Sequence, residues 1–320
     1  MMPNYNRKIL LTGANGFIGY HLTRRLLNEG YQIGIIKREN SDMWRIEDVI
    51  HKLTVFSADL ADTKSVFKVF VDFSPDIVIH LAAHHTVEHQ PSEIPLMVNT
   101  NLTGTLNLLE ASKSTSVYLF VNTSSCFVYK EDNNKLTEQS PLKPLNLYAL
   151  TKLQAEQACN FYNEKYGLKT VTLRLFPPYG PADNERKLIP FVINSFNLGN
   201  PPEMTSGLQK WDFIYVEDVV EAYIKLINCS DSVQCEIFNI GTGTPVSVRE
   251  VVKKIEKSLK TTSKPIWGVI PHRKNESWFN SADINKAKKI LNWEPRTTLE
   301  EGLKLTVDWY KTFGWLRKND

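Results

Sequence analysis

The chain has 320 residues, 42% of them hydrophobic, and a formal net charge of +3 at pH 7. This length suits one large domain or two interlocked ones with a substantial core. Its charges form no basic run of the kind that binds nucleic acid, and its longest apolar stretches are only strand-length, so neither a nucleic-acid partner nor a transmembrane segment is expected. Met1 to Asn6 lacks the apolar core of a signal sequence, and the four cysteines have neither metal-ligand spacing nor the density of a disulfide scaffold. We therefore expect a soluble, cytoplasmic protein.

The first predicted unit is a strand, a glycine turn and a helix. Lys8 to Thr12 is a short apolar run, three glycines follow, and a helical pattern then runs from His21 to Glu29. This is the context of a dinucleotide-binding fingerprint: the first glycine allows a tight turn, the second lets a pyrophosphate approach the backbone, and the third lets the helix pack closely on the strand. We therefore assign to a cofactor Gly13, Asn15, Gly16, Phe17, Ile18 and Gly19.

Two basic residues follow the second predicted strand, Gln32 to Ile36. At this point NAD-binding folds usually carry an acidic residue for the adenosine ribose, whereas a basic residue accommodates the 2′-phosphate of NADP. Lys37 and Arg38 therefore favour NADP(H) over NAD(H), with two solvated charges at a strand end as the alternative interpretation.

Strands and helices continue to alternate. The pattern predicts a strand over Val55–Leu60, an amphipathic helix over Thr63–Asp72 and a buried strand over Asp76–Leu81. Asp59 is placed to hydrogen-bond an adenine, and Ala82–Ala83 provide a floor of small residues under the cofactor. This alternation predicts an α/β fold, a Rossmann-like doubly wound parallel sheet, with its ligand crevice at the carboxyl ends of the strands.

Four histidines cluster in the sequence at positions 80, 84, 85 and 89. His85 and His89 would share one face of a helix, which is a spacing that suits a metal ion. No cysteine or carboxylate set accompanies them, so we assign no metal and favour either a substrate contact or ordinary loop histidines.

A tyrosine and a lysine four residues apart begin a predicted helix. Tyr148 and Lys152 would lie on one face, where the ammonium lowers the phenol pKa from about 10 toward neutrality and makes the pair a proton donor and acceptor. After a strand predicted over Val117–Val121, the hydroxyl of Ser125 would lie on the same edge and polarise a carbonyl. The alternatives are a solvated helix face and hydroxyls that only satisfy backbone groups.

Prolines mark the start of a second, smaller lobe. After a strand predicted over Lys169–Leu175 the alternation loosens, and Pro177, Pro178 and Pro181 interrupt shorter helices. We predict a dinucleotide-binding domain over residues 1–175 and an α/β substrate-binding lobe over residues 176–320, with some segments returning to the main sheet.

Together these features resemble the extended short-chain dehydrogenase/reductase superfamily, in its nucleotide-sugar branch of epimerases, dehydratases and ketoreductases. The resemblance spans nearly the whole chain. It is carried by the glycine turn, by Tyr148–Lys152 and by further ordered motifs, which are Asp59–Leu60, Leu81–Ala83, Asn101–Thr105, Ser124–Tyr129, Tyr179–Pro181, Asp212–Val219, Trp293–Pro295 and Leu299–Leu303.

The resemblance implies that hydride passes between a nicotinamide and a sugar carbon. Tyr148 would be the acid/base, Lys152 would lower its pKa and hold the nicotinamide ribose, and Ser125 would hydrogen-bond the reacting oxygen. The remaining cofactor residues on the matching motifs are Asp59, Leu60, Leu81, Ala82, Ala83, Thr123, Tyr148 and Lys152.

Departures from the family pattern favour a net reductase. The 4,6-dehydratases carry an Asp-Glu pair where this chain has Cys126 and Phe127, so dehydration is not expected. Epimerases usually carry the acidic ribose residue that Lys37 and Arg38 replace. Residues 35–41 with 44–46 are also similar to the enzymes that make CDP-abequose or CDP-paratose by reducing a 4-keto group.

We therefore expect NADPH-dependent reduction of the 4-keto group of a CDP- or dTDP-linked 4-keto-deoxyhexose, in deoxysugar or lipopolysaccharide O-antigen biosynthesis. An NAD-dependent nucleotide-sugar 4-epimerase is the alternative. A non-catalytic NADP-binding protein is the weakest reading, because such proteins tend to have lost the Ser, Tyr and Lys trio. By analogy we also expect a homodimer that buries a face made by Leu102–Ser112 and Leu153–Tyr166.

The family likeness places the nucleotide sugar against the second lobe. Lys187 and Arg273 occupy positions where related enzymes cover the nucleotide and phosphates. Related chains usually have Asn where Pro177 stands and Arg where Trp211 stands, so Trp211 either stacks on a base or sugar or packs the lobe. The substrate residues expected are His85, Ser125, Lys187, Trp211 and Arg273.

Overall fold

The computed structural model describes residues 7–313, so Met1 to Asn6, where no signal sequence is expected, lies outside the described residues. Seven strands form the main sheet: β1 (Lys8–Thr12), β2 (Gln32–Lys37), β3 (Thr54–Ser57), β4 (Ile77–His80), β5 (Leu119–Ser125), β6 (Thr170–Leu175) and β11 (Glu236–Ile240). Their order is β11-β6-β5-β4-β1-β2-β3, and all neighbours are parallel. This order confirms the predicted Rossmann-like, doubly wound sheet.

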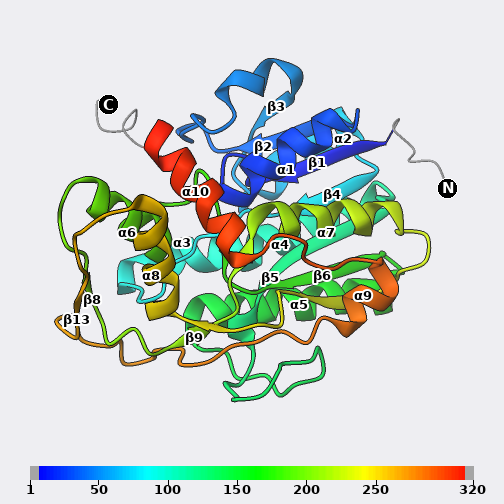
Figure 1. The fold of residues 1–320 in the computed structure, drawn as a ribbon. Coiled ribbons are helices and arrows are strands. Elements are labelled where there is room, and N and C mark those ends of the chain that lie inside the picture. The colour runs from blue at the N-terminus through cyan, green and yellow to red at the C-terminus, as the bar shows by residue number, and fades with distance from the viewer. Residues whose placement is uncertain (1–6, 314–320) are drawn as a thin grey trace.

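Helices cover both faces of this sheet (Figure 1). They are α1 (Phe17–Asn28), α2 (Thr63–Phe73), α4 (Gly104–Ser114), α5 (Leu147–Tyr166), α7 (Val216–Asn228) and α9 (Asn285–Leu291). α1 and α7 lie side by side on one face, with α9 against α7, while α2, α4 and α5 form a row on the other face.

The sheet separates two hydrophobic clusters because successive residues of a strand point to opposite faces. On β1, Ile9 and Leu11 join the cluster under α1 and α7, whereas Leu10 joins the cluster under α2, α4 and α5. On β4, Ile79 and Val78 divide in the same way. These strands are therefore apolar on both sides, as a parallel sheet covered by two helix layers requires.

Two strands, β3 and β5, differ from the prediction by more than one residue at an end. β3 ends at Ser57, because the backbone closes a turn over residues 59–62 instead of continuing the ladder. β5 begins at Leu119, because the Val117 amide still bonds a carbonyl of the preceding helix. β5 also runs past Val121, so Ser125 is the last residue of the strand and not a residue beyond it.

The second lobe has a hydrophobic cluster of its own. Its elements are α6 (Leu188–Asn197), α8 (Val248–Leu259), α10 (Leu299–Phe313), β7 (Pro178–Tyr179), β8 (Glu203–Met204), β9 (Lys210–Trp211), β10 (Ile214–Tyr215), β12 (Val246–Ser247) and β13 (Ile266–Trp267). α6, α8 and α10 surround buried Val192, Val251 and Val307. Between these elements the chain returns to the main sheet for α7 and β11. The division at residue 175 stays a proposal.

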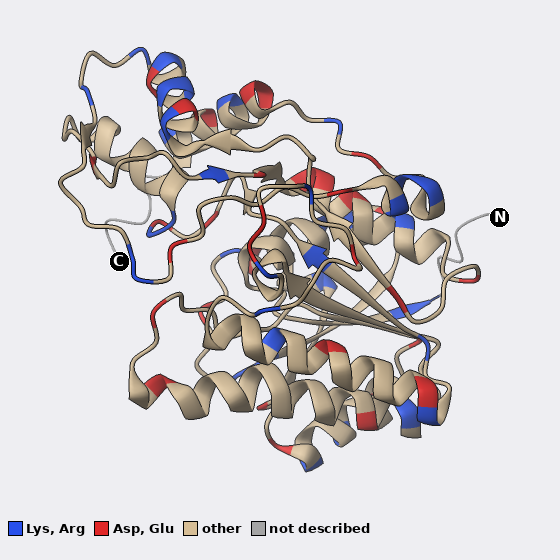
Figure 2. Ribbon diagram, turned by 90° about the horizontal axis from the view of Figure 1, so that it is seen from below, with Lys and Arg blue, Asp and Glu red and all other residues tan. Residues whose placement is uncertain are grey.

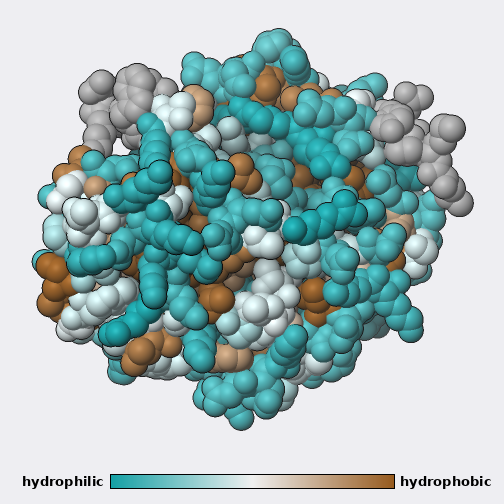
Figure 3. All heavy atoms as spheres, viewed as in Figure 1, coloured by the Kyte–Doolittle hydropathy of each residue, from teal (hydrophilic) through white to brown (hydrophobic). Residues whose placement is uncertain are grey.

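The outer surface carries charges of both signs. Lysine and arginine positions are scattered among aspartate and glutamate positions over the ribbon (Figure 2), and the face in Figure 3 is mainly hydrophilic with separate apolar areas. Within residues 7–313, no helix is both long enough and apolar enough to cross a membrane.

Candidate active site

The glycine turn between β1 and α1 forms a cradle that side chains would fill. Gly13 has φ +72°, and a Cβ added there would lie 2.7 Å from the backbone nitrogen of Ala82. A Cβ on Gly19 would lie 2.1 Å from the Gly13 carbonyl oxygen. Gly16 is the N-cap of α1, where unpaired amides and the helix dipole attract an anion. The cradle therefore fits the pyrophosphate of a dinucleotide.

A buried histidine, His80, holds the residues beside this cradle, Thr12 and Ala82, through hydrogen bonds. The His80 ring lies between the hydroxyls of Thr12, at 2.7 Å, and Thr105, at 3.1 Å. Burial, with a smaller contribution from Lys152, lowers the His80 pKa to about 3, so the ring is neutral. The Thr12 hydroxyl also accepts a hydrogen bond from the Ala82 amide. His80 thus organises the floor, and within residues 7–313 no three metal-ligating side chains gather around an ion-sized site.

A π-helical turn over Asn99–Thr103 positions the histidine loop. Its Asn101 side chain accepts from the His84 amide at 2.7 Å and donates to the His84 carbonyl at 3.0 Å, and it also donates to the Thr151 hydroxyl. The next residue, His85, consequently packs edge-on against Tyr148, with 4.6 Å between ring centroids.

His85 connects the predicted catalytic and substrate residues. Its side chain remains accessible to solvent, yet the surrounding protein crowds the ring. This crowding, followed by the charge of Lys187 and more weakly that of Arg273, lowers the His85 pKa to about 4. The fold therefore brings His85, Tyr148, Lys187 and Arg273 into one electrostatic neighbourhood.

The predicted catalytic trio comes from β5 and the first turns of α5. The Asn146 side chain caps α5 by accepting from the Ala149 amide at 2.9 Å, so Tyr148 lies in the first turn and Lys152 one turn later. The Ser125 side chain accepts from the Phe127 amide at 3.3 Å. Lys152 is 1% exposed and Ser125 is 7% exposed, so both are shielded from bulk water.

The expected lowering of the Tyr148 pKa is not observed. Burial, reinforced by Cys126, raises the pKa of Tyr148 above its ordinary value. Burial also lowers the pKa of Lys152 to about 8, despite the opposing charge of Glu156. Spacing alone gave the wrong sign because it does not report how completely the phenol is desolvated.

The two basic residues proposed for NADP differ in their surroundings: the Lys37 side chain is hydrogen-bonded within its own loop, whereas the Arg38 side chain is exposed. The Lys37 ammonium donates to the backbone carbonyls of Arg38 and Glu39, so it is engaged by its own loop. Arg38 is exposed at the end of β2. Asp59 is also exposed, and one of its carboxylate oxygens accepts from the Ala61 amide.

Two substrate candidates, Lys187 and Trp211, both belong to the second lobe. Lys187 caps α6, pairs with Asp183 at 3.2 Å and lies 5.3 Å from the centre of the Phe17 ring. Trp211 donates through its indole nitrogen to a backbone carbonyl at 2.7 Å and belongs to the cluster under α6, α8 and α10. These contacts favour packing over stacking for Trp211, and its role at the substrate stays a prediction.

Sequence reasoning missed a buried pair of hydroxyls beneath this site. The Tyr223 hydroxyl on α7 lies 2.7 Å from the Thr123 hydroxyl on β5, and both side chains are buried. The two residues are 100 positions apart, and only the helical apolar pattern of α7 marks Tyr223 as inward-facing. This contact anchors α7 directly below the carboxyl end of β5.

Comparisons with known proteins agree with this architecture over nearly the whole chain. A family model, described as the NAD dependent epimerase/dehydratase family, matches residues 9–241. The UDP-glucuronate 4-epimerase of Thermodesulfobacterium geofontis is 32% identical over 313 residues, covering 94% of this chain and 95% of that protein. The dTDP-glucose 4,6-dehydratase of Haemophilus influenzae is 30% identical, covering 94% and 97%.

Solved structures give the same result. The Thermotoga maritima UDP-glucose 4-epimerase with UDP-glucose has a TM-score of 0.88 and 28% identity, covering 95% of this chain and 99% of that one. The Bacillus cereus UDP-glucuronic acid 4-epimerase, in complex with UDP-glucuronic acid and NAD, has a TM-score of 0.86 and 28% identity, covering 96% and 99%.

Proposed function

Because this chain belongs to the NAD dependent epimerase/dehydratase family, we propose that it interconverts the C4 epimers of a nucleotide-linked sugar. The observation that supports the proposal is that Ser125 ends β5 and Tyr148 and Lys152 lie in the first turns of α5, in the same parallel sheet whose β1 leads into the glycine cradle. Likeness to 4-epimerases over the full length supports this reaction ahead of the 4-ketoreductase that the sequence favours.

When bound, the nicotinamide would accept a hydride from C4 of the sugar and return it to the opposite face. Tyr148 takes the proton of the C4 hydroxyl as the carbonyl forms and gives it back when the carbonyl is reduced. Ser125 donates a hydrogen bond to the same oxygen. Tyr148 would start this step as the phenolate, which the buried charge of Lys152 favours. His85, packed on the Tyr148 ring, fixes its orientation.

The nucleotide diphosphate is assigned to the cations of the second lobe. Lys187 and, more weakly, Arg273 both add positive charge around His85. Positive charge there would hold a diphosphate while the sugar reaches Tyr148. The UDP-sugars named for the similar epimerases are the first substrates to test.

A 4-ketoreductase is the second candidate, and Arg38 is the observation that favours it. Its exposed guanidinium at the end of β2 lies where a 2′-phosphate would be recognised. A 4,6-dehydratase is less compatible, because Cys126 is buried with a raised pKa and Phe127 has no ionisable group. A purely cofactor-binding protein would have no use for the intact trio.

The deciding experiment follows each sugar nucleotide by NMR without added cofactor. UDP-glucose, UDP-glucuronate and UDP-N-acetylglucosamine are incubated separately with the purified protein, and any retained dinucleotide is released and identified. Appearance of the C4 epimer with retained NAD(H) supports the epimerase. Stoichiometric consumption of added NADPH by a CDP- or dTDP-4-keto sugar, with no epimerisation of the UDP-sugars, would establish the reductase in its place.

A further inference from the structure

The segment that follows β2 and the segment that follows β7 meet directly at the glycine turn. Arg45 makes this contact: its Nε donates to the Ala182 carbonyl at 2.9 Å, and its Nη1 donates to the Asn15 carbonyl at 3.2 Å. The Asn15 side chain returns the contact by donating to the Asp42 carbonyl at 2.9 Å. One guanidinium therefore ties three loops together across 30 and 137 positions of sequence.

Two features show that this contact is built into the fold. Ile46, the residue after Arg45, is fully buried in the cluster under α1 and α7, which anchors the loop that carries the guanidinium. Ala182 is also fully buried and has φ +62°, a left-handed conformation that an L residue avoids. The strained residue is the one whose carbonyl accepts from Arg45, and the preceding carbonyl, of Pro181, contacts His21 of α1 at 2.9 Å.

The 181–187 segment also contacts α10 of the second lobe. The buried Asp183 carboxylate pairs with Lys187, and the Asp183 carbonyl accepts from the Tyr310 hydroxyl of α10 at 2.8 Å. Burial raises the pKa of Asp183, while the charges of Lys187 and then Arg45 oppose this rise. Movement of the segment away from the glycine turn has to break its contacts with Arg45 and with His21 of α1.

We propose that Arg45 is a positioning residue that slows release of the bound dinucleotide between turnovers, because it holds the segments after β2 and β7 at the glycine turn. Arg45 hydrogen-bonds the Asn15 carbonyl inside the cradle and the Ala182 carbonyl, so it joins the segments that follow β2 and β7 at the glycine turn itself. A dinucleotide bound there leaves only when the segments separate. Slow release suits an enzyme that regenerates its cofactor in every cycle, because the cofactor need not be exchanged. The proposal rests on the cofactor site and not on the identity of the sugar.

The test measures how fast the cofactor leaves the full-length protein. NADH and NADPH are bound in turn, each is chased with an excess of its oxidised form, and the decay of reduced-nucleotide fluorescence gives the release rate. R45M removes both hydrogen bonds and should speed release about tenfold. R25M is the matched control, because Arg25 on α1 pairs with Glu29 and Glu221 and with neither of the two segments, and its release rate should equal that of the wild type.

Release from a folded R45M within twofold of the wild type overturns the proposal. If R45M does not fold, R45K decides, because its single ammonium can hold only one of the two carbonyls and should speed release about threefold. Unchanged release from R45K also overturns it. No sugar enters this assay, so a negative result in the epimerase experiment leaves its outcome unaffected.

Discussion

Tyr148 has a histidine ring on one side and a thiol nearby, and this neighbourhood governs its chemistry. The His85 ring packs on it edge-on, while burial and Cys126 raise the pKa of its phenol. Tyr148→Phe should therefore lower turnover by about 10²–10⁴-fold, the usual contribution of a general acid/base, and leave cofactor affinity within about twofold. Turnover is followed by NMR and affinity by fluorescence titration. Tyr166→Phe, at an exposed site on the same helix, is the control. Full activity in Tyr148→Phe would refute the assigned mechanism.

Lys152 gives a pH dependence whose sign can be worked out. Burial lowers its pKa from 10.5 to about 8, so between these values the unfolded chain binds more protons than the folded protein. Stability linked to this group therefore rises with pH over that window, by up to about 3 kcal/mol, and the penalty is fully present below pH 8.

The Lys152→Met variant lacks this titration. From pH 8 to 10.5 the free energy of unfolding of the wild type should increase relative to that of Lys152→Met. Urea unfolding of both proteins, freed of nucleotide, measures the difference at each pH. Parallel curves for the two proteins would mean that Lys152 titrates in the folded state as it does in water.

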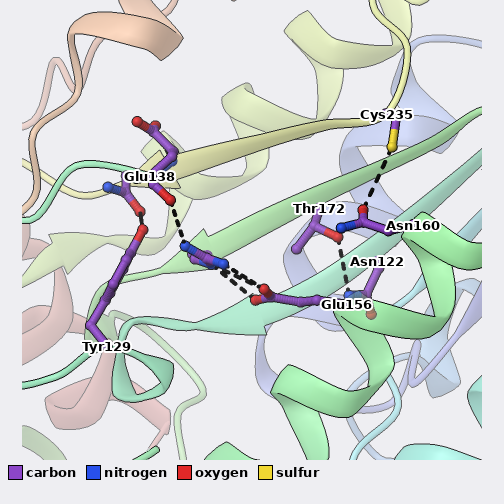
Figure 4. Close-up of polar contacts among 9 residues, drawn as sticks. Asn122, Tyr129, Glu138, Glu156, Asn160, Thr172 and Cys235 are labelled. Atoms are coloured by element: carbon purple, nitrogen blue, oxygen red, sulfur yellow. Dashed lines mark hydrogen bonds and ion pairs between the residues drawn. The ribbon is translucent and has the colours of Figure 1, made fainter. Parts of the chain in front are cut away.

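Among the elements, β6 and α5 are joined by a buried ion pair. Arg174 donates to both carboxylate oxygens of Glu156, and both side chains are almost fully buried. Figure 4 shows Glu156 on one side of this guanidinium and Glu138, whose carbonyl it also contacts, on the other. Removing one partner leaves the other charge buried without compensation.

Glu156→Ala should accordingly lower the free energy of unfolding by about 3–5 kcal/mol. Asp72→Ala is the matched control, because its ion pair with Lys68 on α2 is exposed and should contribute less than about 0.5 kcal/mol. Chemical unfolding measures both variants. Equal effects in the two would show that the buried pair is no more important than the surface pair.

The elements that could be predicted are those whose signal is local. β1, the glycine turn and α2 follow from apolar periodicity and turn residues, and they appear within a few residues of the predicted bounds. β11 could not be placed in the main sheet, because nothing near Glu236–Ile240 specifies β6 as its partner. The same limit applies to the site: Ser125 and Lys152 stand out by type and spacing, whereas Arg45 acts through a residue 137 positions away.

At the scale of the whole molecule, the face of α4 and α5 is apolar and exposed. Leu106 on α4 and Leu150, Phe161 and Tyr166 on α5 are 38–51% exposed. This is the face predicted for a homodimer, and burying it would remove the apolar area from water. If this face forms the proposed homodimer, Phe161→Glu should give a monomer in light scattering where the wild type gives a dimer, while Val71→Glu, exposed on α2, should leave the dimer intact. An unchanged mass for Phe161→Glu would exclude this face as the interface.

The position of β11 also has a consequence for the nascent chain on the ribosome. β6 ends at Leu175, but the strand that covers its outer edge ends at Ile240, after much of the second lobe has been made. At a synthesis rate of about 5–20 residues per second, β6 therefore presents an open strand edge for several seconds. Open edges recruit other strands, so this interval is when the newborn chain is most exposed to aggregation.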